Sequence, residues 1–234
     1  MNFLVIQHLD IEPPALIADV LRASGHKIHT LHLSDGDLLP ADVREYSGAI
    51  IMGGPQSAND THLPHIQDEL IWLQEKLTAG LPMLGICLGA QMMAKAAGAS
   101  ILTSAVRELG WYPVFPTSDS ADDPLFSNIP EQGIRVFQWH GETFSLPPQA
   151  RLLASHPAVA QQAIRLGHAQ YALQFHAEVD AGIIETWIAA GSSERAHLGK
   201  KGIAQIRQET PQYLEEMRRF CQKITKKWLK LVEI

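Results

Sequence analysis

The chain has 234 residues, 46% of them hydrophobic, and a formal net charge of -6. Residues 1–6 have neither the basic segment nor the long apolar run of a signal peptide, and no apolar stretch is long enough to span a membrane. These features argue against a secreted or membrane protein. We therefore expect one α/β domain with a full core, cytoplasmic and without a membrane partner.

The basic residues are concentrated near the end of the chain. Residues 200–230 hold nine Lys or Arg against three Asp or Glu. They are interleaved with apolar positions at helical spacing and lack the aromatic pattern of a nucleic-acid surface, so we expect a solvated helix face and no nucleic acid partner. The two cysteines, Cys87 and Cys221, are expected to be reduced.

Strands and helices alternate through the first part of the chain. Apolar runs and helical periodicity predict strands at 3–7, 27–33, 49–52 and 82–86, and helices at 14–24, 64–79 and 88–97. This order predicts a flavodoxin-like three-layer sandwich, with a mostly parallel sheet covered on both faces. Ligands bind such sheets beyond the carboxyl ends of the strands, so the loops after residues 52 and 86 are expected to be neighbours.

From about residue 99 the pattern changes to short β-like runs separated by Pro-, Gly- and Asp-rich turns. The runs cover 99–103, 111–115, 134–138, 151–154, 158–165 and 171–175. They predict a small antiparallel or mixed extension of the sheet.

The end of the chain is predicted to be helical. A helix after Asp180 is expected to end at Gly191, and a last helix to begin at Thr210-Pro211, with the threonine as N-cap. The apolar residues of the last helix form one stripe, made of Leu214, Met217, Cys221, Ile224, Trp228 and Leu231. We expect residues 1–190 to form the domain, and residues 191–234 an amphipathic extension that packs on it, with Cys221 structural.

The segment Gly85-Ile86-Cys87-Leu88-Gly89 places a cysteine at the corner between a predicted strand and a predicted helix. Its glycines let the backbone turn sharply, and their spacing resembles the nucleophile elbow of hydrolases. A helix N-terminus stabilises negative charge, and the thiolate is the reactive form of cysteine. Cys87 is therefore the candidate nucleophile.

A cysteine nucleophile needs a base, and the base needs an acceptor that orients it. His176 and Glu178 follow the predicted strand 171–175. Residues two apart in an extended chain point the same way, so Glu178 is placed to accept a hydrogen bond from one nitrogen of His176 while the other faces Cys87.

Acyl transfer also needs backbone N–H groups that stabilise a tetrahedral oxyanion. Gly54 follows the predicted strand 49–52 and has no Cβ to crowd a substrate, and Leu88 lies on the first turn of the predicted helix. Both N–H groups are candidate donors.

Four motifs, in this order and at these separations, resemble the class I (triad) glutamine amidotransferases. They are Gly53-Gly54-Pro55-Gln56-Ser57, Gly85-Ile86-Cys87-Leu88-Gly89-Ala90-Gln91, Trp139-His140-Gly141 and Phe175-His176-Ala177-Glu178. The resemblance covers roughly residues 1–190. Within the class, Glu108-Leu109-Gly110-Trp111 and residues 139–143 are most similar to free-standing proteins that resemble the glutaminase domain of GMP synthase.

The resemblance implies that Cys87 attacks the side-chain amide carbon of glutamine, that His176 protonates the departing ammonia, and that Glu178 orients His176. A γ-glutamyl thioester would form and then be hydrolysed to glutamate. The resemblance also implies roles for four pocket residues: Gly54 and Leu88 as oxyanion donors, and Gln91 and Gly141 as contacts of the substrate.

Two positions depart from the usual pattern of the family. Ala90 stands where members often have His, and Ala177 where they often have Pro. Neither residue supplies the chemistry, but the second puts in doubt how closely His176 and Glu178 approach each other.

A metal site at His140, His176 and Glu178 is the alternative for these polar residues. The chain has no His-x-x-x-His pair and no cysteine cluster, and a metal on His176 would remove the base, so we expect no metal and no cofactor. His140 either lines the pocket or satisfies a buried hydrogen bond, and the roles of His8 and Asp10 stay open.

The sequence contains no Gly-x-x-x-x-Gly-Lys-Ser/Thr loop or other recognisable ATP site. Three functions therefore stay open. The chain is a glutaminase that passes ammonia to an unidentified acceptor or partner synthase, or a γ-glutamyl peptidase or hydrolase acting on γ-glutamyl amides, or a non-catalytic binding module of the same fold. The three triad residue types favour the two enzymes.

Overall fold

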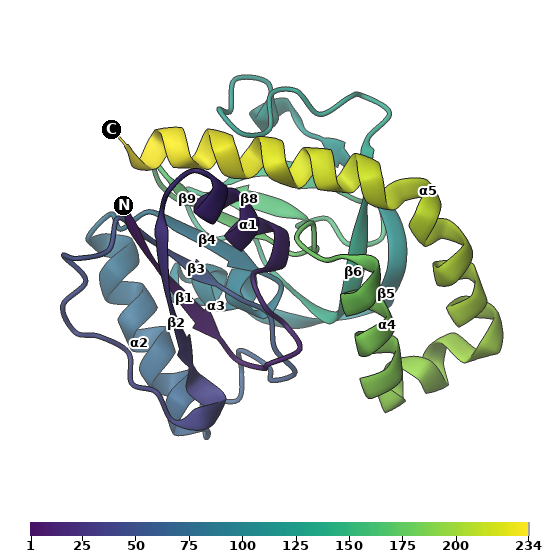
Figure 1. Ribbon diagram of the computed structural model, residues 1–234, viewed down its shortest axis with the longest axis horizontal. Helices are drawn as coiled ribbons and strands as arrows, with labels where there is room; N and C mark the ends of the chain where they lie inside the picture. Colours follow the sequence, from purple (N-terminus) through teal and green to yellow (C-terminus); the bar gives the residue numbers. More distant parts are fainter. Residues whose placement is uncertain (234) are drawn as a thin grey trace.

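The computed structural model describes residues 1–233, whose nine strands form one sheet in the order β2-β1-β3-β4-β9-β8-β7-β5-β6 (Figure 1). The first five strands of this order are mutually parallel: β2 (Lys27–His32), β1 (Asn2–Gln7), β3 (Gly48–Ile51), β4 (Met83–Ile86) and β9 (Gln170–Leu173). The other four are antiparallel to their neighbours: β8 (Ala163–Arg165), β7 (Arg151–Ser155), β5 (Ile101–Pro116) and β6 (Ile134–Phe144).

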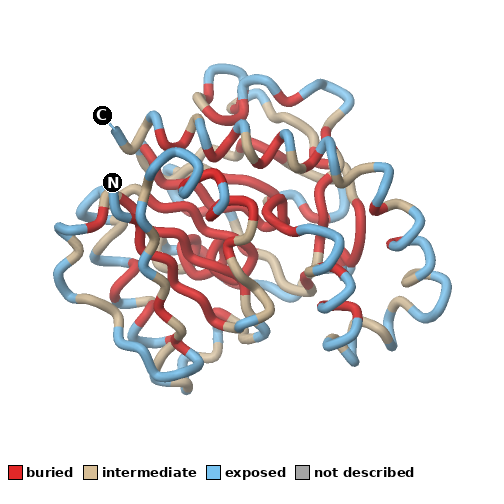
Figure 2. Tube along the Cα trace, in the orientation of Figure 1, coloured by how far each residue is buried: buried red, intermediate tan, exposed pale blue. Residues whose placement is uncertain are grey.

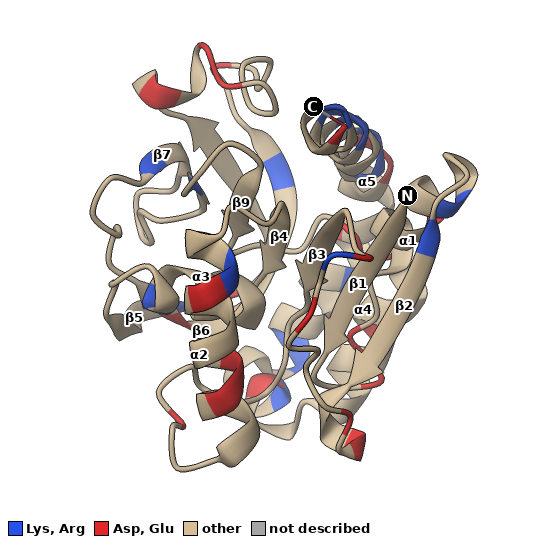
Figure 3. Ribbon diagram, turned by 90° about the vertical axis from the view of Figure 1, so that its left-hand side faces the viewer, with Lys and Arg blue, Asp and Glu red and all other residues tan. Residues whose placement is uncertain are grey.

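Helices cover both faces of the parallel half (Figures 1 and 3). Phe3 and Val5 of β1 point to one face and share a hydrophobic cluster with α1 (Ala15–Ala23) and α5 (Ser192–Val232). Leu4 and Ile6 point to the other face and share a second cluster with α2 (Pro64–Thr78) and α3 (Leu88–Ala96). Strands β1, β3, β4 and β9 are buried between these layers, whereas the edge strand β2 is mostly exposed or half-buried, as Figure 2 shows. The predicted three-layer sandwich is therefore confirmed.

The antiparallel part is larger than the small extension that the sequence predicts. The runs predicted at 99–103 and 111–115 are parts of one strand, β5, which passes through an irregularity between Thr103 and Glu108 and pairs with β6. Polar residues interrupt the apolar pattern of β5, and one of them, Glu108, is buried. Its carboxylate is hydrogen-bonded to His140 and Gln162, which compensates for its burial. Of the run predicted at 158–165, only the last part forms β8.

The last helix begins earlier than the sequence predicts. Helix α4 (Ala181–Ala190) ends before Gly191 as expected, but α5 runs from Ser192 through Pro211, with non-helical backbone at Gly199. Thr210 is therefore no N-cap: its hydroxyl donates to the Ile206 carbonyl and accepts from the Trp111 indole. These contacts hold the helix at the point where Pro211 supplies no N–H.

The stripe predicted on α5 packs on the domain. Met217, Cys221, Ile224 and Trp228 are buried in the same cluster as Phe3. In Figure 3 the ribbon of this helix is coloured blue at its Lys and Arg positions. Two short 3-10 helices, Leu33–Asp35 and Ser118–Ser120, complete the described structure. No helix within residues 1–233 combines the length and the apolar character needed to cross a membrane.

Candidate active site

Cys87 lies at a sharp corner between β4 and α3. Its φ is 51° and its ψ is -107°, a conformation that residues with a Cβ seldom adopt and that marks functional sites. The flanking glycines are required by space: a Cβ on Gly85 would lie 2.8 Å from the Gly89 carbonyl oxygen, and a Cβ on Gly89 would overlap the Ile51 carbonyl. The Gly89 N–H also donates to the Met52 carbonyl at 3.1 Å, so the corner is fixed against the end of β3.

His176 and Glu178 lie beside Cys87, beyond the end of β9. The Nδ1 atom of His176 is 2.7 Å from Oε1 of Glu178, and both side chains are buried. Burial by itself lowers the pKa of His176, but the Glu178 carboxylate and the neighbouring Cys87 outweigh it and raise that pKa well above its ordinary value. Although Ala177 stands where the family often has Pro, the His176 and Glu178 side chains still approach each other closely.

Two further contacts fix the orientation of His176. Its backbone exchanges hydrogen bonds with Phe137 of β6, at 2.8 and 3.2 Å. The Trp187 indole of α4 packs edge-on against the imidazole, with ring centroids 4.6 Å apart, and its N–H donates to the Ile11 carbonyl. The sequence places Trp187 on the apolar face of a helix but contains no signal that this residue contacts the candidate base.

Gly54 and Leu88 are neighbours beside Cys87. An added Cβ on Gly54 would lie 2.8 Å from atoms of the Leu88 and His8 side chains, so the packing of the protein itself requires a glycine here. Among residues 1–233, no hydrogen-bond acceptor is recorded for the N–H group of either Gly54 or Leu88. Both groups are therefore available as donors.

Gln91 and Gly141 line the same cavity as Cys87. The Gln91 amide donates to the Glu142 carbonyl at 3.1 Å and to Gln174 Oε1 at 3.2 Å, and Gln174 Nε2 lies 3.9 Å from the Cys87 sulfur. The Gln91 side chain is therefore held by Glu142 and Gln174, and Gln174 in turn lies beside the Cys87 sulfur. Ala90, at the family's histidine position, is fully buried.

His140 serves both of the roles left open by the sequence. It lines the cavity, and both of its ring nitrogens have partners: Nδ1 lies 2.9 Å from the Glu142 carbonyl, and Nε2 lies 3.1 Å from both Glu108 Oε2 and Gln138 Oε1. Nδ1 of His176 likewise lies 2.7 Å from Oε1 of Glu178.

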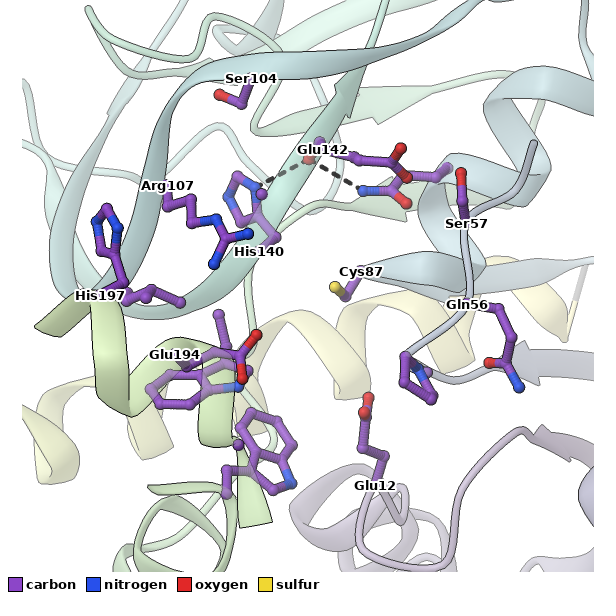
Figure 4. A pocket seen from close by; sticks show the side chains of 18 of the residues that line it. Glu12, Gln56, Ser57, Cys87, Ser104, Arg107, His140, Glu142, Glu194 and His197 are labelled. Atoms are coloured by element: carbon purple, nitrogen blue, oxygen red, sulfur yellow. Dashed lines mark hydrogen bonds between the residues drawn. The ribbon is translucent and has the colours of Figure 1, made fainter. Parts of the chain in front are cut away.

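A cavity of about 1070 Å³ opens over Cys87, between the β5–β6 hairpin and the start of α5. In Figure 4 the Glu12 carboxylate points toward Cys87 from one side, while Arg107 and His140 lie on the other. Burial raises the pKa of the Glu12 carboxyl, although His176 and His8 act to lower it. Glu12 lies in the loop between β1 and α1, where no sequence pattern singled it out.

The two residues after β1 whose roles the sequence left open lie apart. His8 is buried, with its ring nitrogens near the Gly53 carbonyl and the Glu69 carboxylate. Asp10 is exposed and lies beside His32, with 3.3 Å between Asp10 Oδ1 and the His32 ring. His8 thus belongs to the surroundings of Gly54, and Asp10 does not.

Solved structures share this fold over nearly the whole chain. A glutamine amidotransferase from Thermotoga maritima is 30% identical, with a TM-score of 0.88 over 100% of this chain and 99% of that one. A glutamine amido transferase from Methylobacillus flagellatus is 27% identical, with a TM-score of 0.90 over 98% and 94% of the two chains. The flavodoxin-like fold is the fold of these neighbours.

Curated relatives lead to the same family. The glutamine amidotransferase-like protein YfeJ of Salmonella typhimurium is 29% identical over 210 residues, which are 86% of this chain and 87% of the relative. The GMP synthase [glutamine-hydrolyzing] of Hahella chejuensis is 33% identical over 61% of this chain but only 28% of its own length. The family model for class-I glutamine amidotransferases matches residues 14–189, and the chain belongs to that family.

Proposed function

We propose that this protein hydrolyses the side-chain amide of glutamine through a γ-glutamyl thioester on Cys87. The observation that carries the proposal is the meeting of three groups at one corner of the sheet. Cys87 projects from a left-handed corner, His176 lies close enough for Cys87 to raise its pKa, and Glu178 Oε1 lies 2.7 Å from Nδ1 of that histidine. A binding module would have no need of a cysteine in this conformation beside a base and its orienting carboxylate.

In the first half of the reaction, the Cys87 sulfur attacks the amide carbon and forms a tetrahedral oxyanion. The N–H groups of Gly54 and Leu88 stabilise the negative oxygen, each worth roughly 3 kcal/mol in comparable sites. His176 then donates a proton to the amide nitrogen, the carbon–nitrogen bond breaks, and ammonia leaves. The raised pKa of His176 favours the protonated form that this step requires.

In the second half, water attacks the thioester carbon. His176 accepts a proton from the water, a second oxyanion forms in the same place, and the carbon–sulfur bond breaks to release glutamate. Glu178 holds His176 in one orientation and stabilises its positive charge in both halves. Gln91 and Gly141, which line the cavity beside Cys87, contact the glutamyl part of the substrate.

The ammonia is proposed to pass to an acceptor bound by a separate synthase. The support is that this chain matches about a quarter of the length of a GMP synthase, whose name joins glutamine hydrolysis to a synthase reaction. Cleavage of γ-glutamyl amides of larger amines is the second candidate. It is favoured by the cavity of about 1070 Å³, which lies just above the ~300–1,000 Å³ range of drug-sized ligand sites and is larger than glutamine alone would fill.

We also propose that residues 1–190 carry the chemistry and that residues 191–234 are an extension packed on this domain. The family match ends at residue 189. Trp228 of α5 lies in the core beside Phe3, with ring centroids 5.5 Å apart, and its indole N–H donates to the Ala169 carbonyl. Residue 234 lies outside the described part of the chain.

Turnover by the purified protein tests these proposals. We expect release of ammonia and glutamate from glutamine, and a Cys87 adduct with a glutamine-like electrophile, located by mass spectrometry. Faster cleavage of γ-glutamyl ethylamide than of glutamine would instead support the second candidate. If neither substrate is turned over and Cys87 is not labelled, the enzyme proposal is wrong and the binding module remains.

A further inference from the structure

We infer that the buried pair His8 and Glu69 positions the Gly53–Gly54 peptide, so that the Gly54 N–H points at the oxyanion. The inference rests on the proposed function, because it concerns a donor for the thioester reaction. Neither His8 nor Gly53 lines the cavity over Cys87, whereas Gly54 does. His8 and Glu69 are therefore positioning residues that act through the backbone.

Two hydrogen bonds connect this pair to the peptide. His8 Nδ1 lies 3.1 Å from the Gly53 carbonyl oxygen, and His8 Nε2 lies 2.8 Å from Oε2 of Glu69 on α2. Both side chains are completely buried. A carbonyl oxygen only accepts hydrogen bonds, so Nδ1 of His8 must carry the proton that joins them. The bond to Gly53 is therefore present whether the proton between His8 and Glu69 lies on the ring or on the carboxylate.

The direction of the Gly54 N–H follows from the geometry of the peptide. All peptide bonds within residues 1–233 are trans, and in a trans peptide the C=O and the next N–H point in opposite directions. Because His8 holds the Gly53 oxygen on the side away from the cavity, the Gly54 N–H points toward the cavity. A flipped peptide would turn its oxygen toward the site and set its N–H against the N–H of His8.

The surroundings of His8 favour this hydrogen bond. Burial by itself lowers the pKa of His8, but the Glu69 carboxylate and the Gly53 carbonyl outweigh it and raise that pKa. Among the described residues, Oε1 of Glu69 has no hydrogen-bond partner, so His8 is the one recorded partner of this buried carboxylate. Buried ion pairs contribute little net stability compared with apolar packing. We attribute the burial of the His8–Glu69 pair to its role in orienting the Gly53–Gly54 peptide.

The test compares two reactions of the same sulfur. Acylation of Cys87 by glutamine passes through an oxyanion, whereas alkylation by iodoacetamide does not. The double variant His8→Leu/Glu69→Met removes the donor without leaving a carboxylate buried and unpaired. We expect its acylation rate to fall roughly 10²-fold, the effect of losing one oxyanion donor, while alkylation changes less than about twofold. The variant His8→Asn/Glu69→Met carries an amide N–H near the position of Nδ1 and leaves no carboxylate unpaired, and we expect it to recover most of the acylation rate.

Equal loss of both reactions would mean that the pair only supports the fold around Cys87, and unchanged acylation would mean that it does not hold the peptide. Either result overturns the inference. Crystal structures of the wild type and the double variant give a second reading that needs no turnover. We expect the Gly53–Gly54 peptide to rotate in the variant, and a peptide that keeps its orientation contradicts the inference even if the wild type proves inactive on glutamine.

Discussion

The two cysteines of this chain are both buried, yet their surroundings differ in every respect that governs reactivity. Cys87 is 7% exposed, sits at a left-handed corner and lines a cavity. Cys221 is 1% exposed and lies within helix α5, against Thr225. Burial raises the pKa of the Cys221 thiol, with Glu178 adding to the effect, so that thiol stays protonated.

The difference shows that burial alone does not decide what a thiol does. Cys87 lies beside His176, whose pKa is raised by Glu178 and by Cys87 itself, whereas the Cys221 sulfur lies 4.0 Å from the hydroxyl of Thr225. A thiol that lies beside a charged partner and opens onto a cavity is suited to act as a nucleophile. A thiol packed among apolar side chains behaves as a small hydrophobic group.

Replacing the two cysteines in turn gives the largest contrast. We expect Cys87→Ser to lower release of glutamate from glutamine by roughly 10⁴-fold or more, because it removes the nucleophile. Cys221→Ser is the matched control and should keep its activity, since this side chain lies outside the cavity. The assay is glutamate release at saturating glutamine. Substantial activity of Cys87→Ser would show that another residue is the nucleophile.

Glu178→Gln tests the charge that separates the two sites. We expect turnover to fall by roughly 10²–10⁴-fold, because His176 loses the carboxylate that orients it and stabilises its charge. Glu185→Gln, which removes an exposed carboxylate paired with Arg207, is the control and should leave turnover unchanged. Steady-state kinetics separate the two effects. Equal turnover in both variants would remove Glu178 from the proposed mechanism.

Gly89→Ala tests whether the corner at Cys87 depends on close packing. The added Cβ would overlap the Ile51 carbonyl, so we expect a loss of about 1–3 kcal/mol in the free energy of unfolding, together with reduced activity. Gly182→Ala in α4 is the control. Its Cβ would lie 3.2 Å from a single side-chain oxygen of Asp180, and the free energy should change by less than about 1 kcal/mol. Urea unfolding measures both, and equal stabilities would refute the packing argument.

Cys221→Ala tests whether Cys221 contributes only to the packing of the core. Removing a buried sulfur should lower the free energy of unfolding by about 1–2 kcal/mol, through lost contacts and a small cavity, while turnover stays unchanged. Urea unfolding and glutamate release together check this outcome. A loss of turnover without a loss of stability would mean that α5 takes part in the site.

The pH dependence of stability should show the charge on His176. Its pKa is raised in the folded protein, so its stabilising effect is complete below the unfolded value, about pH 6.5, and is lost as the pH rises through the raised value. The difference in free energy of unfolding between the wild type and His176→Gln should therefore shrink as the pH rises above about 6.5. A difference that grows with pH would contradict the raised pKa.

Much of the fold is predictable from the sequence because local patterns agree with the tertiary arrangement. The strand before Cys87, the helix after it and the parallel sheet follow from apolar runs bounded by glycines. The start of α5 was predicted wrongly because Thr210-Pro211 has the local signature of a helix start. The contacts of Thr210 with Trp111 and Ile206, 99 and 4 residues away, override that signature.

The chain order of the motifs determined which residues to place at the candidate site, since a corner flanked by glycines and a His-x-Glu after a strand can be read along one segment each. The side chains that surround these residues can be identified from the tertiary structure alone. Glu12, Trp187 and the His8–Glu69 pair come from separate segments that carry no motif of their own. Their effect on His176 and Gly54 depends on distances between side chains far apart in the sequence, which packing sets and local pattern does not.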